Sequence, residues 1–300
     1  MRFLLFSVLL LFSWMKHFGQ TCAVNGSINT ISTICTGQSI TLSVPSLTYS
    51  CYSVSSLPSN LQTGLVSYYP FCFNPQDQAI SGNNHFYSIG GATLTTDRFG
   101  NYGFAYDLDG KVTFMDAPSS GFSLGNSART IAFWFYDRGS LNTGPDSIAS
   151  SLLSYGFTNP NQLFQILHMA NSVPGSVNLN FSGSGIISNT VKAGFNSWQF
   201  MAFSLDALSN YTIYINGSTA GTGTLNINTS VGNLRIGRSL GNPPYYFNGK
   251  IDDVYIYNRD LSQSEILQLY TINMSTPIYS WSTGATTGSI SVSPTIATIY

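Results

Sequence analysis

The sequence has 300 residues, of which 8% are charged, and its net charge at pH 7 is −1. This balance excludes the basic footprint of a nucleic-acid-binding protein and a polybasic patch for anionic membranes. The remaining composition is rich in Ser, Thr, Asn, Gly, Tyr and Phe, with frequent turn residues, and it is typical of all-β extracellular modules.

The first twenty residues (1–20) predict a secretory signal peptide. Arg2 gives the segment a basic start, and an apolar run from Phe3 to Trp14 follows. This run is too short to span a bilayer and suits a signal sequence. We expect cleavage near Gly19 or Gln20 and a mature, secreted chain that has no membrane span.

Strand patterns recur along the rest of the chain. Asn216-Gly217 predicts a two-residue hairpin turn, because both central residues of such a turn need a positive φ. The segments that read as strands bounded by turn residues are 130–136, 197–205, 211–217, 233–238 and 251–257.

One short helix is predicted, over residues 263–270. Ser262 and Glu265 have the spacing of a capping box, in which each residue satisfies a backbone N–H of the first helical turn. Leu261 and Ile266 are placed to form the accompanying hydrophobic staple. The helix closes an otherwise all-β domain.

The order of several segments carries a family resemblance. "GLVSYYPF" (64–71) is followed by "RTIAFWFY", "WQFMAFSLD", "YTIYINGS" and "LRIGRS", and then by the closing segment "FNGKIDDVYIYNRDLSQSEI". Residues 61–272 resemble the laminin-G-like, concanavalin A-like lectin/glucanase domains of bacterial secreted proteins. The resemblance implies an all-β, concanavalin-type jelly-roll β-sandwich with one short C-terminal helix.

The two flanks, 21–60 and 273–300, resemble partial Ig-like β segments of bacterial surface proteins. The resemblance rests on "TICTGQSITLSV" (33–44) and "YSWSTGATTGSISVSPTIATIY" (279–300). Either the jelly roll is inserted within one Ig-like module, or it lies between two incomplete ones. Because the sequence stops inside an expected strand, we expect a longer protein whose C-terminal part could attach it to the cell surface.

The four cysteines all lie in the first quarter of the chain, and their spacing alone allows three disulfide pairings. Cys51 and Cys72 bracket the start of the jelly roll, so we predict that they are bonded. Cys22 and Cys35 would form the second pair, within the N-terminal flank.

Asp252 raises a question of charge compensation. Strand alternation places it on the same face as Val254 and Ile256, with Asp253 on the opposite, outward face. A carboxylate at the edge of an apolar core needs a cation, backbone donors or an arginine.

The resemblance implies a structural calcium ion as one answer. In the family, an acid in the loop after the opening strand and the first acid of the "IDD" segment share the ion, which corresponds here to Asp77 and Asp252. Asn83, in the same loop as Asp77, would add an oxygen ligand. The alternative is a metal-free Asp252 held by backbone amides.

A catalytic constellation is not apparent in the sequence. Glycosidases of this fold use paired carboxylates, but the single glutamate, Glu265, is accounted for by the capping box. Asp107 and Asp109 share a strand face, and we interpret them as an exposed strand edge and turn. His85 reads as a solvated loop residue and His168 as a residue at a sheet surface.

Tyr245 and Tyr246 are candidate ligand-binding residues, because they follow a stiff Pro-Pro pair and could present a stacking surface. The alternative is that they cover a sheet edge. We predict a non-catalytic extracellular module that binds a glycan or a protein and is adhesin-like. A structural spacer in a surface fibre and, less well supported, a glycan hydrolase are the alternatives.

Overall fold

The structure is a computed structural model of the chain that describes residues 33–34, 40–43, 54–141, 149–159, 161–170, 177–182, 186–189, 194–241, 244–272, 289–292 and 298–299. Two compact units can be distinguished: Cys51–Ser275, and Met1–Ser50 together with Thr276–Tyr300. The predicted signal peptide lies outside the described residues. No helix in the described part of the chain has the length and apolarity needed to cross a membrane.

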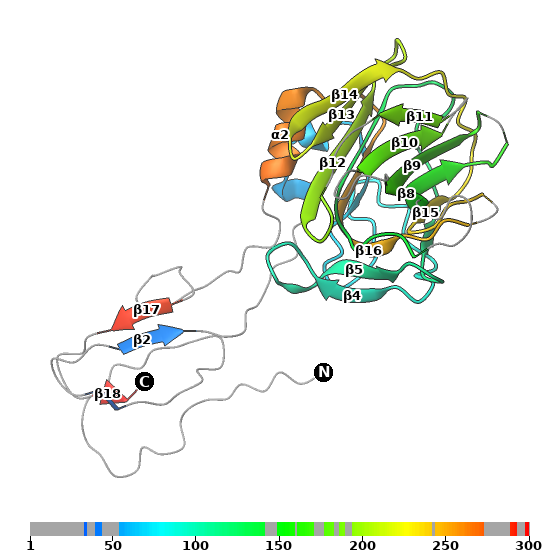
Figure 1. The fold of residues 1–300 in the computed structure, drawn as a ribbon. Helices are drawn as coiled ribbons and strands as arrows, with labels where there is room; N and C mark the ends of the chain where they lie inside the picture. Colours follow the sequence, from blue (N-terminus) through cyan, green and yellow to red (C-terminus); the bar gives the residue numbers. More distant parts are fainter. Residues whose placement is uncertain are drawn as a thin grey trace. The chain divides into compact units, whose positions relative to one another are not determined.

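The larger unit contains two antiparallel sheets, which lie against each other in Figure 1. The six-stranded sheet has the order β11 (Ile186–Asn189), β10 (Val177–Ser182), β9 (Leu163–Ala170), β8 (Ala149–Gly156), β15 (Leu234–Ile236) and β6 (Met115–Ala117). The eight-stranded sheet has the order β14 (Ser218–Thr224), β13 (Asn210–Ile215), β12 (Trp198–Leu205), β7 (Arg129–Asp137), β16 (Asn248–Tyr257), β5 (Tyr102–Asp109) and β4 (Thr93–Thr96), with β3 (Leu65–Tyr69) also paired to β16.

Alternation along the strands builds the core between the sheets. In β7, Ile131, Phe133 and Phe135 belong to the main buried cluster, whereas Ala132 and Trp134 belong to a second cluster on the other face of the strand. Each fully buried aliphatic or aromatic side chain contributes roughly 1.5–3 kcal/mol to folding. This arrangement confirms the predicted β-sandwich.

Three short helices accompany the second cluster on the outer face of the eight-stranded sheet: η1 (Val54–Ser56), α1 (Ser59–Gln62) and α2 (Gln263–Thr271). Val54 and Leu57 are buried in this cluster. The packed unit therefore includes residues before the predicted start at residue 61.

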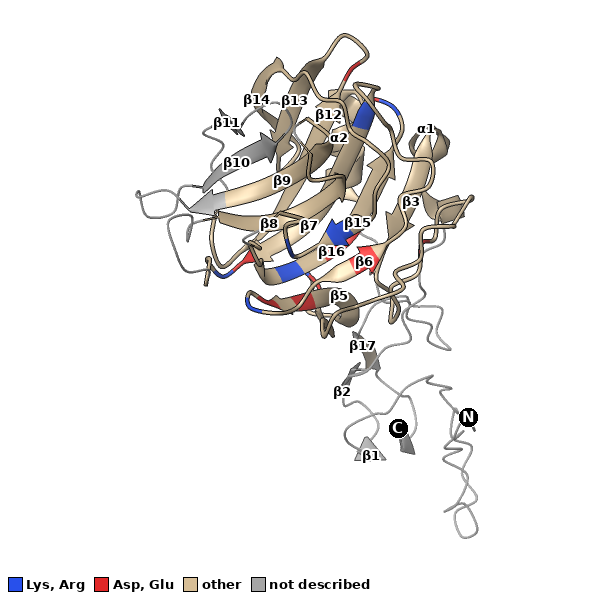
Figure 2. Cartoon of the chain, turned by 90° about the vertical axis from the view of Figure 1, so that its right-hand side faces the viewer, with Lys and Arg blue, Asp and Glu red and all other residues tan. Residues whose placement is uncertain are grey.

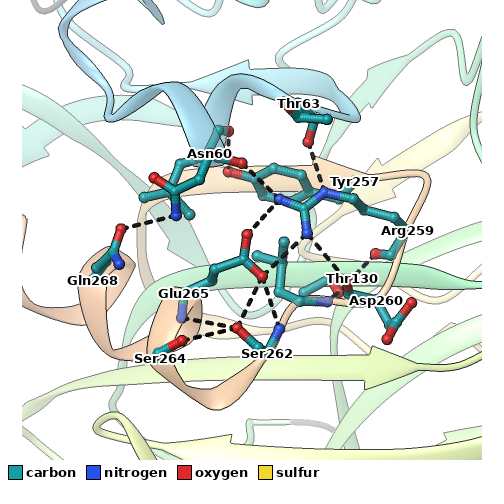
Figure 3. Close-up of polar contacts among 12 residues, drawn as sticks. Asn60, Thr63, Thr130, Tyr257, Arg259, Asp260, Ser262, Ser264, Glu265 and Gln268 are labelled. Carbon is teal, nitrogen blue, oxygen red and sulfur yellow. Dashed lines mark hydrogen bonds and ion pairs between the residues drawn. The ribbon is translucent and has the colours of Figure 1, made fainter.

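The start of α2 is fixed as the capping box predicts (Figure 3). Glu265 N donates to Ser262 Oγ at 3.4 Å, and Ser262 N donates to Glu265 Oε2 at 3.0 Å. Arg259 adds two hydrogen bonds to the Glu265 carboxylate, at 2.7 and 3.1 Å, and another at 2.7 Å to the carbonyl of Asn60 in α1. Hydrogen bonds from Arg259 lower the pKa of Glu265 to about 2. Glu265 is thus occupied by a structural role.

The predicted hairpin turn is also confirmed. Asn216 and Gly217 join β13 to β14, and their φ angles are 50° and 76°. A Cβ atom on Gly217 would lie 3.0 Å from side-chain atoms of Leu267 and Tyr270, so glycine also allows α2 to approach.

In the smaller unit, strands from the two flanks pair with each other. β1 (Thr33–Ile34) pairs with β18 (Thr298–Ile299), and β2 (Ile40–Ser43) pairs with β17 (Ser289–Val292), both antiparallel. The Ig-like character of these flanks remains a prediction.

Cys72 is disulfide-bonded and buried. The other cysteines, Cys22, Cys35 and Cys51, lie outside the described residues. The pairings Cys51–Cys72 and Cys22–Cys35 therefore remain predictions.

Candidate functional site

Asp252 does not lie on the face that strict alternation predicts. A β-bulge interrupts the pairing of β16 with β7 between Asp252 and Tyr255, and Asp253 within it has a φ of 45°. Asp252 lies opposite Trp134, and directly paired residues share a face. The prediction that Asp252 shares the Val254 face is therefore wrong, because the bulge adds a residue and reverses the alternation.

Arg98, in the turn between β4 and β5, compensates both aspartates. Its Nη1 atom lies 3.0 Å from Asp252 Oδ2 and 2.8 Å from Asp253 Oδ2. Asp253, predicted to face outward, is buried at 3% exposure. The Arg98 guanidinium also lies over the rings of Phe99 and Trp134, 4.5 Å from each centroid.

One arginine faces two buried acids, so its charge can balance only one ionised carboxylate. Burial, followed by the charge of Asp253, raises the pKa of Asp252 well above its usual value, although Arg98 acts in the opposite direction. Arg98 Nη2 also donates to the carbonyl of Ile272 at 3.1 Å, just after α2. The cluster has a structural role, because it joins the β4–β5 turn to β16 and to the end of α2.

Asp77 does not belong to the Arg98 cluster and accepts hydrogen bonds from a different set of donors, in β3 and in its own loop. Its Oδ1 accepts from the backbone N–H groups of Tyr68 at 2.9 Å and Ala79 at 3.0 Å. Its Oδ2 accepts from Ser67 Oγ at 2.9 Å and Asn84 N at 3.2 Å. A carboxylate has about four acceptor positions. Asp77 therefore has none left for a metal ion in this arrangement.

The described residues do not fit the predicted shared calcium site. Asp77 is saturated by protein donors, Asp252 pairs with Arg98, and Asn83 is exposed. Within the described ranges, no group of three or more His, Cys, Asp or Glu side chains is placed to hold a metal ion. The calcium site remains a prediction that needs a direct test.

We expect the same melting temperature for the full chain in millimolar calcium and in chelator, because protein groups already compensate both aspartates. A bound ion would stabilise the chain by about 2.7 kcal/mol at a hundred times its dissociation constant. Differential scanning calorimetry measures this directly. A melting temperature that rises with calcium concentration in wild type, and not in Asp77→Ala, would restore the calcium site.

Tyr246 belongs to a different region, the outer face of the six-stranded sheet. It pairs with Arg238 through an isolated β-bridge just after β15 and is half-buried. Tyr245 is also half-buried, and its backbone is fixed by a hydrogen bond from its N–H to Ser239 Oγ at 2.8 Å. Of the two predicted ligand-binding tyrosines, Tyr246 lies beside charged groups.

A row of polar side chains crosses this outer face. Leu234 and Ile236 of β15 lie in the core, so Arg235 between them points outward. The directly paired residues of the neighbouring strands share its face, and the row runs Asp116, Arg235, Ser154 and Gln165. In Figure 2, acidic and basic segments lie near β6 and β15 in a mostly uncharged molecule.

Arginines and aromatic rings alternate next to this row. Arg235 lies over the Phe114 ring at 4.7 Å, Arg238 over the same ring at 5.2 Å, and Arg238 over the Tyr246 ring at 5.4 Å. Arg235 also binds Asp116 through two hydrogen bonds, of 2.6 and 2.7 Å, which raise the pKa of its guanidinium. We call Phe114, Asp116, Arg235, Arg238 and Tyr246 the arginine face.

Further polar groups border the arginine face. Tyr87 is 60% exposed, and its hydroxyl accepts a hydrogen bond from Asn233 Nδ2 at 2.9 Å. On the other side, the buried Ser154 Oγ has no hydrogen-bond partner. The arginine face and its border thus combine aromatic rings, charged donors, an amide and a hydroxyl, which are the groups that bind sugar rings and their hydroxyls.

The remaining polar candidates have structural partners. Asp107 forms an ion pair with Arg138. Asp109 Oδ1 accepts three backbone hydrogen bonds from the turn that follows it, at 2.9 to 3.0 Å. Partial burial opposes this effect, but these bonds lower the pKa of Asp109 well below its usual value.

His168 is a correction to the sequence analysis. It is buried rather than at a sheet surface, and its Nδ1 pairs with Asp137. Burial lowers the pKa of His168 to about 3, so the imidazole is neutral at physiological pH. His85 is exposed, as expected, and its Nδ1 accepts from Asp77 N at 3.1 Å.

Arg235 and Arg238 were missed as candidate site residues. The sequence did carry a signal for Arg235, because a charged residue between Leu234 and Ile236 must face away from the core. Arg98 had no such signal, since its partners lie more than 150 positions along the chain.

Two face-to-face antiparallel sheets with a helix-covered outer face define a jelly-roll β-sandwich. A family model of the concanavalin A-like lectin/glucanases superfamily matches residues 109–267. The chain belongs to this superfamily. No curated protein matches the sequence.

Solved structures show the same fold at low sequence identity. Domain 4 of AbnA, an extracellular GH43 arabinanase from Geobacillus stearothermophilus solved with arabinotriose, is 21% identical with a TM-score of 0.53, over 69% of this chain and 98% of that one. The binding domain of Paraclostridial Mosquitocidal Protein 1 is 19% identical (TM-score 0.54), over 70% of this chain and 52% of that one. The binding domain of botulinum neurotoxin DC, solved with rat synaptotagmin II, is 14% identical (TM-score 0.51), over 70% and 52%. The chain therefore matches about half the length of each toxin domain.

Proposed function

We propose that the chain is a secreted, non-catalytic module that binds a glycan through the arginine face. The observation that carries this proposal is the pair of half-buried arginines, Arg235 and Arg238, that lie over the half-buried rings of Phe114 and Tyr246 on the outer face of the six-stranded sheet. Aromatic rings cover the apolar faces of sugars, and fixed polar groups bind their hydroxyls.

The fold supports this proposal without deciding it, since one fold hosts many functions. A similar domain, that of AbnA, was solved with arabinotriose, whereas the neurotoxin domain was solved with a protein. A protein ligand is therefore the second candidate, and a structural spacer the third. The carboxylates of Asp107, Asp109 and Glu265 are engaged in ion pairs or hydrogen bonds with other groups of the chain, and this supports a non-catalytic role.

The wild-type chain should bind at least one glycan on an array of plant, animal and bacterial oligosaccharides. Tyr246→Ala should weaken that binding about tenfold or more, as expected when an aromatic contact at the centre of a binding surface is removed. Tyr102→Ala is the matched control, because Tyr102 is 63% exposed on β5 of the other sheet. An array without any bound glycan, or equal losses in the two variants, would contradict the proposal.

A further inference from the structure

The charges of the arginine face are not balanced. Asp116 compensates the charge of Arg235 through the bidentate pair described above. Arg238 has no acidic partner among the side chains that the structure describes, and its buried Nε makes no hydrogen bond. One positive charge is therefore left beside Phe114 and Tyr246.

Arg238 is half-buried and its Nε is buried, so the terminal Nη1–Nη2 end of the guanidinium is the part that a ligand can reach. Its guanidinium carbon lies over the rings of Phe114 and Tyr246, and such cation–π contacts use the flat face of the group. The N–H donors lie in the plane of the guanidinium, in a fork that matches the two oxygens of a carboxylate. An arginine held by two rings is also ordered before it binds, which reduces the entropy lost on binding.

We propose that the arginine face recognises a carboxylate-bearing sugar and that Arg238 binds its carboxylate. This inference rests on the proposed glycan binding and adds the chemical class of the ligand. The sugar ring stacks on an aromatic ring of the face, and the acid group reaches the Arg238 fork. A sulfated sugar is the competing ligand, and the test separates it.

The experiment compares matched acidic and neutral sugars on the full chain by isothermal titration calorimetry. The pairs are oligogalacturonate with its fully methyl-esterified form, and sialyllactose with lactose. Wild type should prefer the acid of at least one pair by about tenfold or more, because a hydrogen bond to a charged group contributes about that factor. Arg238→Gln should abolish this preference, so that the ratio of the acidic to the neutral affinity falls to about one.

Two controls locate the effect. Arg238→Lys keeps the charge but loses the fork, so it should retain only part of the preference. Lys250→Gln removes the same charge from the eight-stranded sheet, where Lys250 donates to Thr96 Oγ1 at 3.0 Å, and should leave the preference intact.

The outcomes separate the two proposals. Equal binding of acidic and neutral sugars would overturn the carboxylate inference and leave glycan binding intact, as would tighter binding of sulfated lactose than of sialyllactose. An acid preference that survives Arg238→Gln would overturn the role of Arg238. Absence of binding to every sugar tested would contradict both.

Discussion

Replacing Arg98 with methionine should lower the free energy of unfolding by about 3–5 kcal/mol, since breaking a buried ion pair leaves uncompensated charge in the interior. Here the substitution leaves two carboxylates, those of Asp252 and Asp253, without their cationic partner, and both residues are buried, at 2% and 3% exposure. Methionine preserves part of the packing against Trp134. Chemical denaturation of the full chain measures the difference.

Arg138→Met is the matched control, because the side chains of its pair with Asp107 are 30% and 29% exposed. Exposed pairs contribute about 0–1 kcal/mol, so a much smaller loss is expected. Equal losses in the two variants would contradict the compensating role of Arg98.

The effect of Arg98→Met should also depend on pH. Arg98 lowers the pKa of both aspartates, so its removal lets the already raised pKa values rise further. Between the ordinary aspartate pKa of about 3.9 and the raised value, the folded state binds more protons than the unfolded state. The unfolding free energy therefore falls as pH rises, and the loss should be smaller at pH 4 than at pH 8. The reverse trend would show that the carboxylates do not cause the loss.

Asp77→Ala should lower the free energy of unfolding by about 4 kcal/mol or more, because it leaves four buried donors without an acceptor, each at a cost of about 1–3 kcal/mol. The donors tie β3 to the loop of residues 77–84. Urea unfolding measures the loss.

Asp206→Ala provides the comparison for Asp77→Ala. Asp206 accepts backbone N–H groups of Leu208 and Asn210 at 2.8 Å in an exposed turn, where water replaces the lost acceptor. Asp206→Ala should therefore lower the free energy of unfolding less than Asp77→Ala does. If Asp77→Ala were as stable as wild type, the role of Asp77 as a buried anchor would be wrong.

Local sequence rules accounted for the features that depend on neighbouring residues. The capping box at Ser262 and Glu265 and the turn at Asn216-Gly217 need only a few adjacent positions, and both form as predicted. The sandwich itself followed from strand patterns together with the family resemblance.

Features that depend on contacts between distant residues could not be predicted from the sequence. The bulge at Asp253 requires a positive φ, and no pattern in the neighbouring residues indicates it. The bulge moves Asp252 to the other face of the sheet. The Arg98 pair and the burial of His168 depend on contacts across the fold. Of the candidate site, Tyr246 was identified from its loop, whereas its stacking partner Arg238 required the structure.

The central claim, that the arginine face binds a glycan, can be tested most directly by NMR of arginine side chains. The full chain labelled with ¹⁵N-arginine gives Nε–H signals that single substitutions assign. On addition of the tightest-binding array glycan, the signals of Arg235 and Arg238 should shift, while those of the buried Arg98 and Arg129 should not. Shifts confined to other arginines, or saturable binding that leaves Arg235 and Arg238 unchanged, would contradict the claim.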